Sequence, residues 1–358
     1  MDRQVAIIGA GMAGLSAALA LKDAGIPVAI YEKSRALGGR VATRRVGDSV
    51  IDHGAQVIKP DGSPLADLMM DRLSTEDLVQ ITGDVRLYDD AGNFLNPDPE
   101  HASQRMFSYR TGITSLPKLL VSSLLVGGVQ IYRETKITAM EEFSSSVLLR
   151  NEEWDEAGRA DAVIVTAPTP QASELLSASH VQDITASRQC AELLRSLYFK
   201  PCLSVLLGYS GDLPEPPCYA VMPENRERPL LWLAFEHLKS PSRAPVGHQL
   251  LVAQLGPEVS WDMYASEGEE VLQVTLESLG FLFSETYAKP DWCQVKRWRY
   301  ALPSGYIPFE EANPVGLESR IFFASDGLMP GGGRIQDAYE CGQLAAARVM
   351  DLFERESQ

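Results

Sequence analysis

Residues 4–21 read Gln-Val-Ala-Ile-Ile-Gly-Ala-Gly-Met-Ala-Gly-Leu-Ser-Ala-Ala-Leu-Ala-Leu. A short apolar run is followed by Gly9-x-Gly11-x-x-Gly14 and then by residues that favour a helix up to Leu21. Gly25 ends that helix, and Pro27 to Tyr31 form a second apolar run. The order strand, glycine turn, helix, strand predicts a βαβ unit at the start of the chain.

Each glycine of the turn has a separate physical role in such a unit. Gly9 permits the tight turn, Gly11 lets a pyrophosphate approach the backbone, and Gly14 lets the helix pack closely on the strand. The first residues of the helix then present free N–H groups and the positive end of its dipole to the phosphates. The motif therefore predicts a dinucleotide site, and the alternative is an ordinary glycine-rich turn.

An acidic residue stands where the second strand ends. Glu32 lies eighteen residues beyond Gly14, at the spacing of a carboxylate that accepts hydrogen bonds from an adenosine ribose. A carboxylate there repels a 2′-phosphate, so NADP is disfavoured in this site. The alternative is a strand-end acid facing solvent.

Residues 33–45 read Lys-Ser-Arg-Ala-Leu-Gly-Gly-Arg-Val-Ala-Thr-Arg-Arg. Gly38-Gly39 predicts a second close backbone approach, and Arg40 can reach a pyrophosphate as a bidentate donor. A simple NAD enzyme has no use for this extension, whereas FAD continues beyond its pyrophosphate into a ribityl chain and ring. For Arg35, Arg44 and Arg45 a solvated basic turn is the alternative.

Composition restricts the remaining classes. The 358 residues contain 32 Lys and Arg against 48 Asp and Glu, a net charge of −16, which argues against nucleic acid or an anionic membrane as partner. A small-molecule substrate stays compatible. No apolar run is long enough for a membrane span. The five scattered cysteines contain no CxxC and suggest reduced thiols in a cytoplasmic protein, and no metal site is expected.

The pattern along the chain predicts two domains. We expect an α/β fold: a Rossmann-type FAD-binding domain built from the discontinuous segments 1–59, 105–172 and 300–358. Residues 60–104 and 173–299 form an inserted α+β substrate domain with a mostly antiparallel sheet, because apolar runs at 203–208, 230–235 and 249–255 alternate with turns. The substrate cavity is expected between the two domains.

Several segments together resemble a known family. They are residues 32–45, Ile51-Asp52-His53-Gly54-Ala55-Gln56, and the runs 160–171, 297–303 and 325–333. These segments resemble the flavin-containing amine oxidase superfamily and, within it, the bacterial renalase-like oxidoreductases. The resemblance covers the nucleotide-binding parts at both ends, whereas residues 60–105 and 172–290 follow it only in order and length.

The resemblance and the motifs together predict the cofactor contacts. Asp326 follows a buried strand and would accept from a ribityl hydroxyl, while Gly331-Gly332-Gly333 opens a helix whose N-terminus would face the flavin and favour its reduction. Cys341 lies inside that helix, so the FAD is expected to be non-covalent. The expected contacts are Gly9, Gly11, Met12, Ala13, Gly14, Glu32, Lys33, Gly39, Arg40, Gly54, Ala55, Gln56, Ile137, Ala167, Asp326, Gly333, Arg334 and Ile335.

The substrate side is predicted from one strand and one turn. Period two places Lys296, Trp298 and Tyr300 on one face of a strand. The renalase-like resemblance implies that Trp298 and Tyr300 line the cavity over the flavin, and the alternative is packing of the sheet on a helix. His53 is a candidate acid or base, with a structural role as its alternative.

These observations predict an FAD-dependent oxidase or dehydrogenase. A hydride passes from a small substrate to flavin N5, and oxygen reoxidises the flavin and yields hydrogen peroxide. The resemblance implies a dihydronicotinamide isomer of NAD(P)H as substrate. An amine oxidase acting on a primary or secondary amine and a non-catalytic flavin-binding protein are the alternatives. The oligomeric state stays open.

Overall fold

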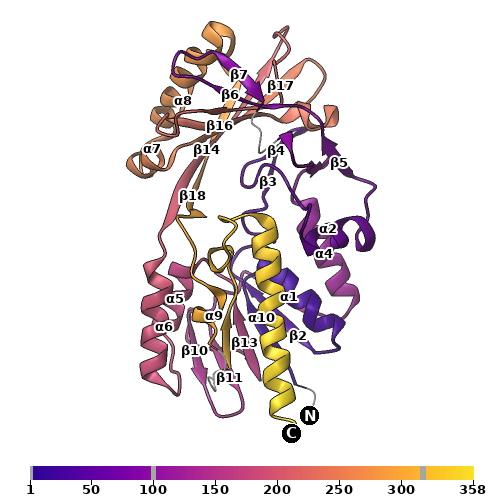
Figure 1. Ribbon diagram of the computed structural model, residues 1–358, viewed down its shortest axis with the longest axis vertical. Coiled ribbons are helices and arrows are strands. Elements are labelled where there is room, and N and C mark those ends of the chain that lie inside the picture. Colours follow the sequence, from indigo (N-terminus) through magenta and orange to yellow (C-terminus); the bar gives the residue numbers. More distant parts are fainter. Residues whose placement is uncertain (1–2, 98–101, 315–319) are drawn as a thin grey trace.

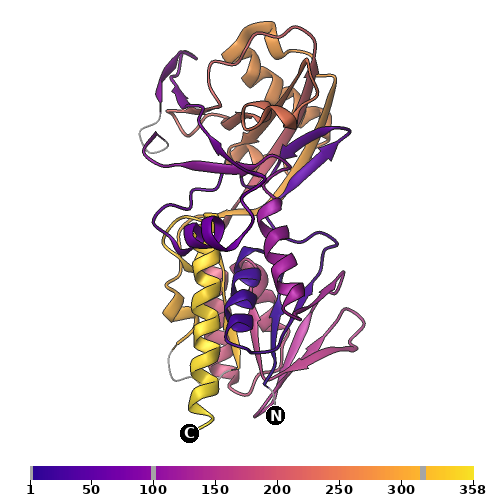
Figure 2. The same ribbon diagram turned by 90° about the vertical axis from the view of Figure 1, so that its right-hand side faces the viewer.

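The computed structural model describes residues 3–97, 102–314 and 320–358 and shows two lobes, one above the other (Figure 1). The first lobe is built on a five-stranded parallel sheet, and the second on a seven-stranded sheet that is mostly antiparallel. Turned by 90°, the molecule again shows one lobe above the other (Figure 2). The predicted fold class, a Rossmann-type α/β unit with an α+β partner, is confirmed.

The parallel sheet explains the apolar runs of the sequence. Its order is β19-β13-β1-β2-β9, with both chain ends and the middle of the chain contributing neighbouring strands. Residues of β1, β2 and β13 are all buried, as expected of a parallel sheet covered on both faces. The bounds are Val5–Ile8 (β1), Val28–Glu32 (β2), Gln130–Arg133 (β9), Ala162–Val165 (β13) and Ile321–Phe323 (β19).

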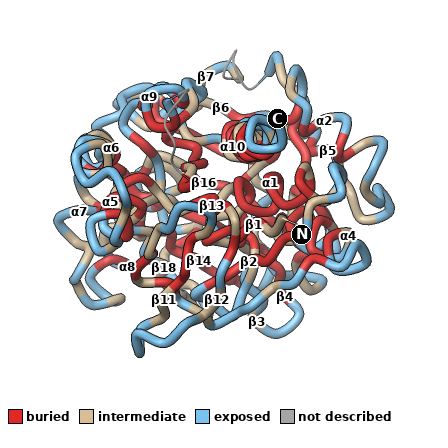
Figure 3. Tube along the Cα trace, turned by 90° about the horizontal axis from the view of Figure 1, so that it is seen from below, coloured by how far each residue is buried: buried red, intermediate tan, exposed pale blue. Residues whose placement is uncertain are grey.

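Two helices from opposite ends of the chain pack side by side on this sheet (Figure 3). They are α1 (Met12–Asp23) and α10 (Ile335–Arg355). A Cβ on Gly342 would come within 2.2 Å of the Ala13 carbonyl oxygen, so glycine permits the close crossing. The Ser16 hydroxyl donates to the carbonyl of Tyr339 at 2.6 Å, which ties the two helices together.

Other elements complete the first lobe. Helix α4 precedes β9, and an antiparallel meander of β10, β11 and β12 shares the same core. Leu65, Met69 and Leu194 also lie in this core, although they come from segments expected in the substrate domain. The division at residues 60 and 173 stays a proposal, and this packing favours moving residues 64–73 and 173–197 to the first lobe. The bounds are Pro64–Asp67 (α2), Ser115–Val126 (α4), Ala139–Glu142 (β10), Val147–Arg150 (β11), Glu156–Ala160 (β12), Thr169–Ser177 (α5), Ile184–Ser196 (α6) and Phe309–Ala312 (α9).

The second lobe is a sheet in the order β18-β14-β17-β16-β15-β6-β7 with helices α7 and α8. The long strand β18 pairs with β14 and leads from the second lobe into the first (Figure 1). In this pairing Trp298 lies opposite Cys202 and Lys296 opposite Ser204. The bounds are Val85–Tyr88 (β6), Phe94–Pro97 (β7), Phe199–Ser210 (β14), Ala220–Pro223 (β15), Leu230–Phe235 (β16), His248–Leu255 (β17), Pro257–Asp262 (α7), Gly268–Phe283 (α8) and Trp292–Pro303 (β18).

A buried charge network joins the lobes beside the hairpin of β3 (Thr43–Val46) and β4 (Ser49–Asp52). Its side chains are fully buried: Asp52, Glu236, Lys239 and Arg243. Arg243 Nη1 lies 2.7 Å from Asp52 Oδ2, and Lys239 Nζ lies 2.6 Å from Glu236 Oε1. Burial alone would raise the pKa of Asp52, but Arg243 and Lys239 lower it strongly. Asp52 therefore stays ionised, and its ion pairs fix the hairpin to the second lobe.

Two further features bear on the sequence predictions. The five cysteines form no disulfide. Across residues 3–97, 102–314 and 320–358, none of the helices combines the length and apolar character that crossing a membrane requires.

Candidate cofactor and substrate site

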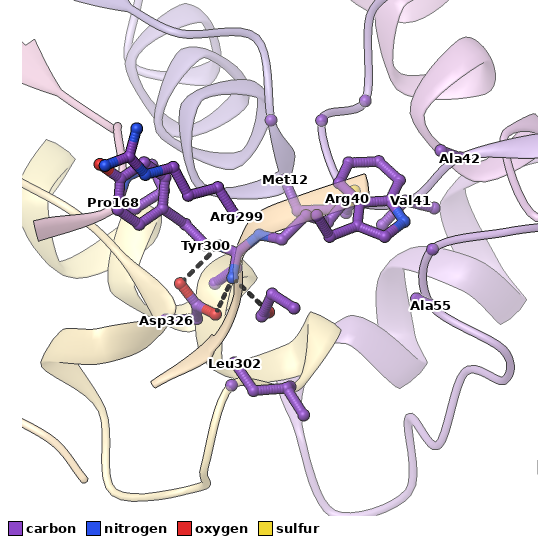
Figure 4. A pocket seen from close by; sticks show the side chains of 18 of the residues that line it. Met12, Arg40, Val41, Ala42, Ala55, Pro168, Arg299, Tyr300, Leu302 and Asp326 are labelled. Atoms are coloured by element: carbon purple, nitrogen blue, oxygen red, sulfur yellow. Dashed lines mark hydrogen bonds and ion pairs between the residues drawn. The ribbon is translucent and has the colours of Figure 1, made fainter. Parts of the chain in front are cut away.

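A cavity of about 1470 Å³ lies between the lobes (Figure 4). Its wall includes the first glycine turn, most of the segment 31–44, the start of α10 and residues 296–302 of β18. Pockets for small ligands usually measure about 300–1,000 Å³. This cavity is larger, so an extended cofactor leaves space for a substrate.

The first glycine turn divides its roles as the motif predicts. Gly9 has φ +110°, and a Cβ there would lie 2.5 Å from Thr166 Oγ1. A Cβ on Gly14 would come 2.0 Å from the Gly9 carbonyl oxygen, so Gly14 lies behind the wall and serves the close packing of α1 on the turn. At Gly11 a Cβ would meet no atom of the chain within 4 Å, and this residue lines the cavity. Gly11 thus leaves open the space that a bound pyrophosphate would need.

Glu32 is buried at the end of β2 and organises two turns. Its Oε2 accepts from the N–H of Ala10, and its Oε1 accepts from the N–H of Ser34, each at 2.8 Å. A carboxylate has about four acceptor positions. Two therefore remain for ribose hydroxyls, so the structure is compatible with the predicted role.

The Gly38-Gly39 pair lies against the first glycine turn. Gly38 and Gly39 have φ +104° and +58°, and the Gly38 N–H donates to the carbonyl of Ala10 at 2.8 Å. A Cβ on Gly39 would lie 3.3 Å from Gly11 Cα. The two turns form one backbone wall that side chains would obstruct.

Arg40 and Asp326 contact each other directly (Figure 4). Arg40 Nη1 donates to Asp326 Oδ2 at 2.7 Å, and Nη2 donates to Oδ1 at 2.6 Å. Nη1 also donates to the carbonyl of Ala301 at 3.0 Å. Both side chains line the cavity. The contact of Arg40 with a pyrophosphate and that of Asp326 with a ribityl hydroxyl stay predictions. The pair also joins the N-terminal segment to the C-terminal segment.

The start of α10 supplies the third backbone element of the wall. Gly332 and Gly333 have φ +82° and +88°, and Gly333, Arg334 and Ile335 line the cavity. Asp337 Oδ2 accepts from the N–H of Arg334 at 2.7 Å and caps the helix. The positive end of the helix therefore faces the cavity, where it favours negative charge on a ligand.

The remaining predicted contacts gather on the same wall. They are Met12, Ala13, Lys33, Gly54, Ala55, Gln56, Ile137 and Ala167. Sequence reasoning missed Gln254, whose Nε2 donates to the carbonyl of Gly54 at 2.9 Å and which reaches the wall from β17. No motif marks Gln254, because only the sheet register brings it there. Asp52, which precedes His53 in the segment that resembles the family, does not line the cavity and belongs to the buried charge network.

The candidate substrate wall is held by Trp298 and His53. Trp298 Nε1 donates to the His53 carbonyl at 2.8 Å, and the two rings stack with centroids 5.3 Å apart. Tyr300 meets Phe199 edge to face at 6.2 Å. His53, Trp298 and Tyr300 all line the cavity. Trp298 and Tyr300 also pack against other rings, so lining the cavity and packing the sheet are compatible roles.

His53 is neutral at pH 7. Burial lowers its pKa to about 4, and the positive charges of Lys296 and Arg44 contribute in the same direction. Its Nδ1 is buried and has no hydrogen-bond partner within the described segments. A neutral imidazole can accept a proton, but it lacks the second ring proton that an imidazolium would donate as a general acid.

The described residues contain no cluster of potential metal ligands. Among residues 3–97, 102–314 and 320–358, no three His, Cys, Asp or Glu side chains gather in a way that could hold an ion. The absence of a metal site stays a prediction.

One cavity is lined by two glycine turns, the acceptor Glu32 and the N-terminus of α10. This arrangement defines an FAD-dependent oxidoreductase. The family profile described as flavin containing amine oxidoreductase matches residues 12–100 and 95–350, and the chain belongs to this family. FAD is accordingly its cofactor.

Individual comparisons agree with this assignment. Putrescine oxidase from Kocuria rosea is 40% identical over 76 residues, which are 21% of this chain and 16% of that protein. The alignments to the curated relatives cover only 10% to 16% of those proteins. Two solved structures match over 99% of this chain at 16% identity, which shows the fold alone. One is cyclohexylamine oxidase from Brevibacterium oxydans (TM-score 0.77, 100% of that chain), and the other is a protein from Exiguobacterium provisionally named a protoporphyrinogen oxidase (TM-score 0.79, 99%).

Proposed function

We propose that this protein is a renalase-like FAD-dependent oxidase or dehydrogenase that oxidises a small substrate, a dihydronicotinamide isomer of NAD(P)H. One observation carries the proposal. The cavity wall that the second lobe contributes contains no carboxylate among its described residues, because the acidic lining residues Glu32, Glu174 and Asp326 all belong to the first lobe. A cationic amine would find no counter-charge on that wall, whereas a neutral ring needs none and an anionic group would meet Lys and Arg there.

The reaction balances without a protein base. Bound FAD would accept the hydride at N5 and return the electrons to oxygen. The dihydronicotinamide loses one hydride and becomes the aromatic cation, and O₂ takes up these two electrons with the hydride's proton and one solvent proton to give hydrogen peroxide. No residue of the chain has to remove a proton from carbon, which agrees with the low pKa of His53, about 4, because such an imidazole is a weak base.

The chain's own residues bind and orient in this proposal. Trp298 is fixed by its hydrogen bond to the His53 carbonyl, so its indole face can support a flat ring in the cavity. The stacked His53 keeps that indole in place. Ring-on-ring contact of this kind sets distance and angle for hydride transfer.

We further propose that the FAD is held without a covalent bond. Cys341 is buried inside α10, and its Sγ accepts from the backbone N–H of Ser325 at 3.3 Å. Burial raises its pKa to about 12, so it is not a reactive thiolate. The unpaired cysteines also support the proposed cytoplasmic location.

An amine oxidase is the second candidate, since putrescine oxidase is a relative in sequence and cyclohexylamine oxidase one in fold. Anaerobic mixing separates the two. The holoenzyme is mixed with dihydronicotinamide isomers, with polyamines and with aromatic amines while flavin absorbance is followed. We expect bleaching by a dihydronicotinamide isomer. Bleaching by an amine alone would replace the proposal with amine oxidation, and bleaching by neither would favour a non-catalytic flavoprotein.

A further inference from the structure

The charge of the cavity is opposite to the charge of the protein. The chain carries a net charge of −16, yet ten Lys and Arg line the cavity against three carboxylates. Two of those carboxylates are engaged, because Glu32 accepts from backbone N–H groups and Asp326 binds Arg40. A basic pocket within an acidic surface concentrates anions at one place.

Two of the cations that line the cavity have no carboxylate partner among the described residues. They are Arg44 on β3 and Lys296 on β18. Within the described segments neither side chain has an ion pair or a hydrogen bond. Burial lowers the pKa of Lys296, and the charge of Arg44 lowers it further. Arg44 is exposed and Lys296 is half-buried, so each keeps its donors available to a ligand that supplies negative charge in the cavity.

The location of this pair relates it to the substrate and not to the dinucleotide turn. Lys296 is two residues before Trp298, so both side chains lie on the same face of β18. The His53 N–H donates to the carbonyl of Ala42 at 3.0 Å, two residues before Arg44, and the His53 ring stacks on Trp298. The pair therefore lies beside the aromatic wall, and the Arg guanidinium and Lys ammonium suit an oxyanion.

We propose that Arg44 and Lys296 form a subsite of the cavity that binds an oxyanion of the substrate, a carboxylate or a phosphate. The inference rests on the proposed function for the site itself and adds to it the class of substrate: an acid or phosphate ester carrying a flat ring, and not a polyamine.

The test measures binding without turnover. Dissociation constants of benzoate, phenyl phosphate and benzylamine are obtained for the oxidised holoenzyme from perturbation of the flavin spectrum. The double variant Arg44→Gln with Lys296→Gln is compared with a control that removes two exposed cations elsewhere, Arg188→Gln with Lys289→Gln. FAD content and melting temperature are recorded for each protein.

We expect wild type and control to bind at least one of the two anions about tenfold or more tightly than benzylamine. The Arg44 and Lys296 double variant should lose that preference at unchanged FAD content, and raised salt should weaken the wild-type preference. Comparing the dissociation constants of benzoate and phenyl phosphate shows whether the subsite prefers a carboxylate or a phosphate. Equal binding of anions and amine by wild type, or a preference retained in the double variant, overturns the subsite. These results do not depend on which reductant bleaches the flavin, so the proposed function can fail separately.

Discussion

Arg40 and Asp326 are 286 residues apart in sequence and are joined by two hydrogen bonds of 2.7 and 2.6 Å. Asp326 is almost completely buried, and Arg40 also lies 5.7 Å over the ring of Phe199. A planar guanidinium matches a carboxylate in this two-point geometry. The pair therefore fixes the segment after β2 to the segment after β19, and the cavity depends on both.

Removing one partner of this pair should weaken the apoprotein. Asp326→Asn leaves Arg40 without its buried counter-charge, and we expect a loss of about 2–4 kcal/mol in unfolding free energy. Arg40→Lys keeps the charge but loses the two-point geometry, so its loss should be smaller. Urea unfolding of the apoproteins measures both, with the exposed Asp351→Asn as control. An unchanged midpoint for Asp326→Asn would show that the pair does not hold the segments together.

The glycines of the first turn should separate into two kinds. Gly11→Ala adds a Cβ that meets no protein atom, so apoprotein stability should stay within about 1 kcal/mol while FAD affinity falls. Gly14→Ala forces a Cβ against the Gly9 carbonyl oxygen and should destabilise the apoprotein by about 1–3 kcal/mol. Melting temperatures with and without FAD measure both effects. Equal FAD affinity for Gly11→Ala and wild type would contradict the role of Gly11.

Glu32→Ala should lower FAD occupancy. The change removes the proposed ribose acceptor and two hydrogen bonds to the backbone N–H groups of Ala10 and Ser34, so the melting temperature should fall as well. Flavin released per chain measures occupancy, with the exposed Glu153→Ala as control. Full flavin content in the Glu32→Ala protein would refute the ribose assignment.

His53 should make stability depend on pH below neutrality. Its folded-state pKa of about 4 lies below the ordinary value of 6.5, so the unfolded chain binds the proton first as pH falls. Wild type should therefore lose about 1–3 kcal/mol between pH 6.5 and 4 relative to His53→Gln, and the difference should be constant above pH 7. Chemical unfolding of both proteins across this range measures it. A difference that does not change with pH would mean that His53 titrates normally.

Arg243→Met tests the buried charge network. Asp52 and Glu236 would keep only Lys239 as a positive partner, and we expect a loss of about 3–5 kcal/mol. The exposed pair of Arg105 and Asp61 provides the comparison, since Arg105→Met should cost less than about 1 kcal/mol. A loss for Arg243→Met as small as that of the control would show that the network does not fix the hairpin.

The glycine turns of the cavity wall can be predicted from the sequence because backbone requirements are local. Gly9, Gly14 and the Gly38-Gly39 pair each occupy a position where φ or close approach demands glycine, so spacing alone indicates their arrangement. The parallel strands are equally visible as continuous apolar runs. FAD and the fold class followed from these features.

The substrate wall was harder to predict because tertiary register decides it. Gln254 and Lys296 reach the cavity from strands whose neighbours are fixed only by the seven-stranded sheet. The role of Asp52 also depended on partners nearly two hundred residues away, Lys239 and Arg243, which no local pattern connects to it. Likewise the contact of Arg40 with Asp326 joins two motifs whose separate roles gave no sign of direct pairing.

The flavin content of the purified chain shows whether both ends of the chain hold one FAD without a covalent bond. We expect a yellow protein that releases one FAD per chain when it is denatured. A chain that stays colourless after incubation with FAD, or one whose flavin remains attached after denaturation, would contradict it.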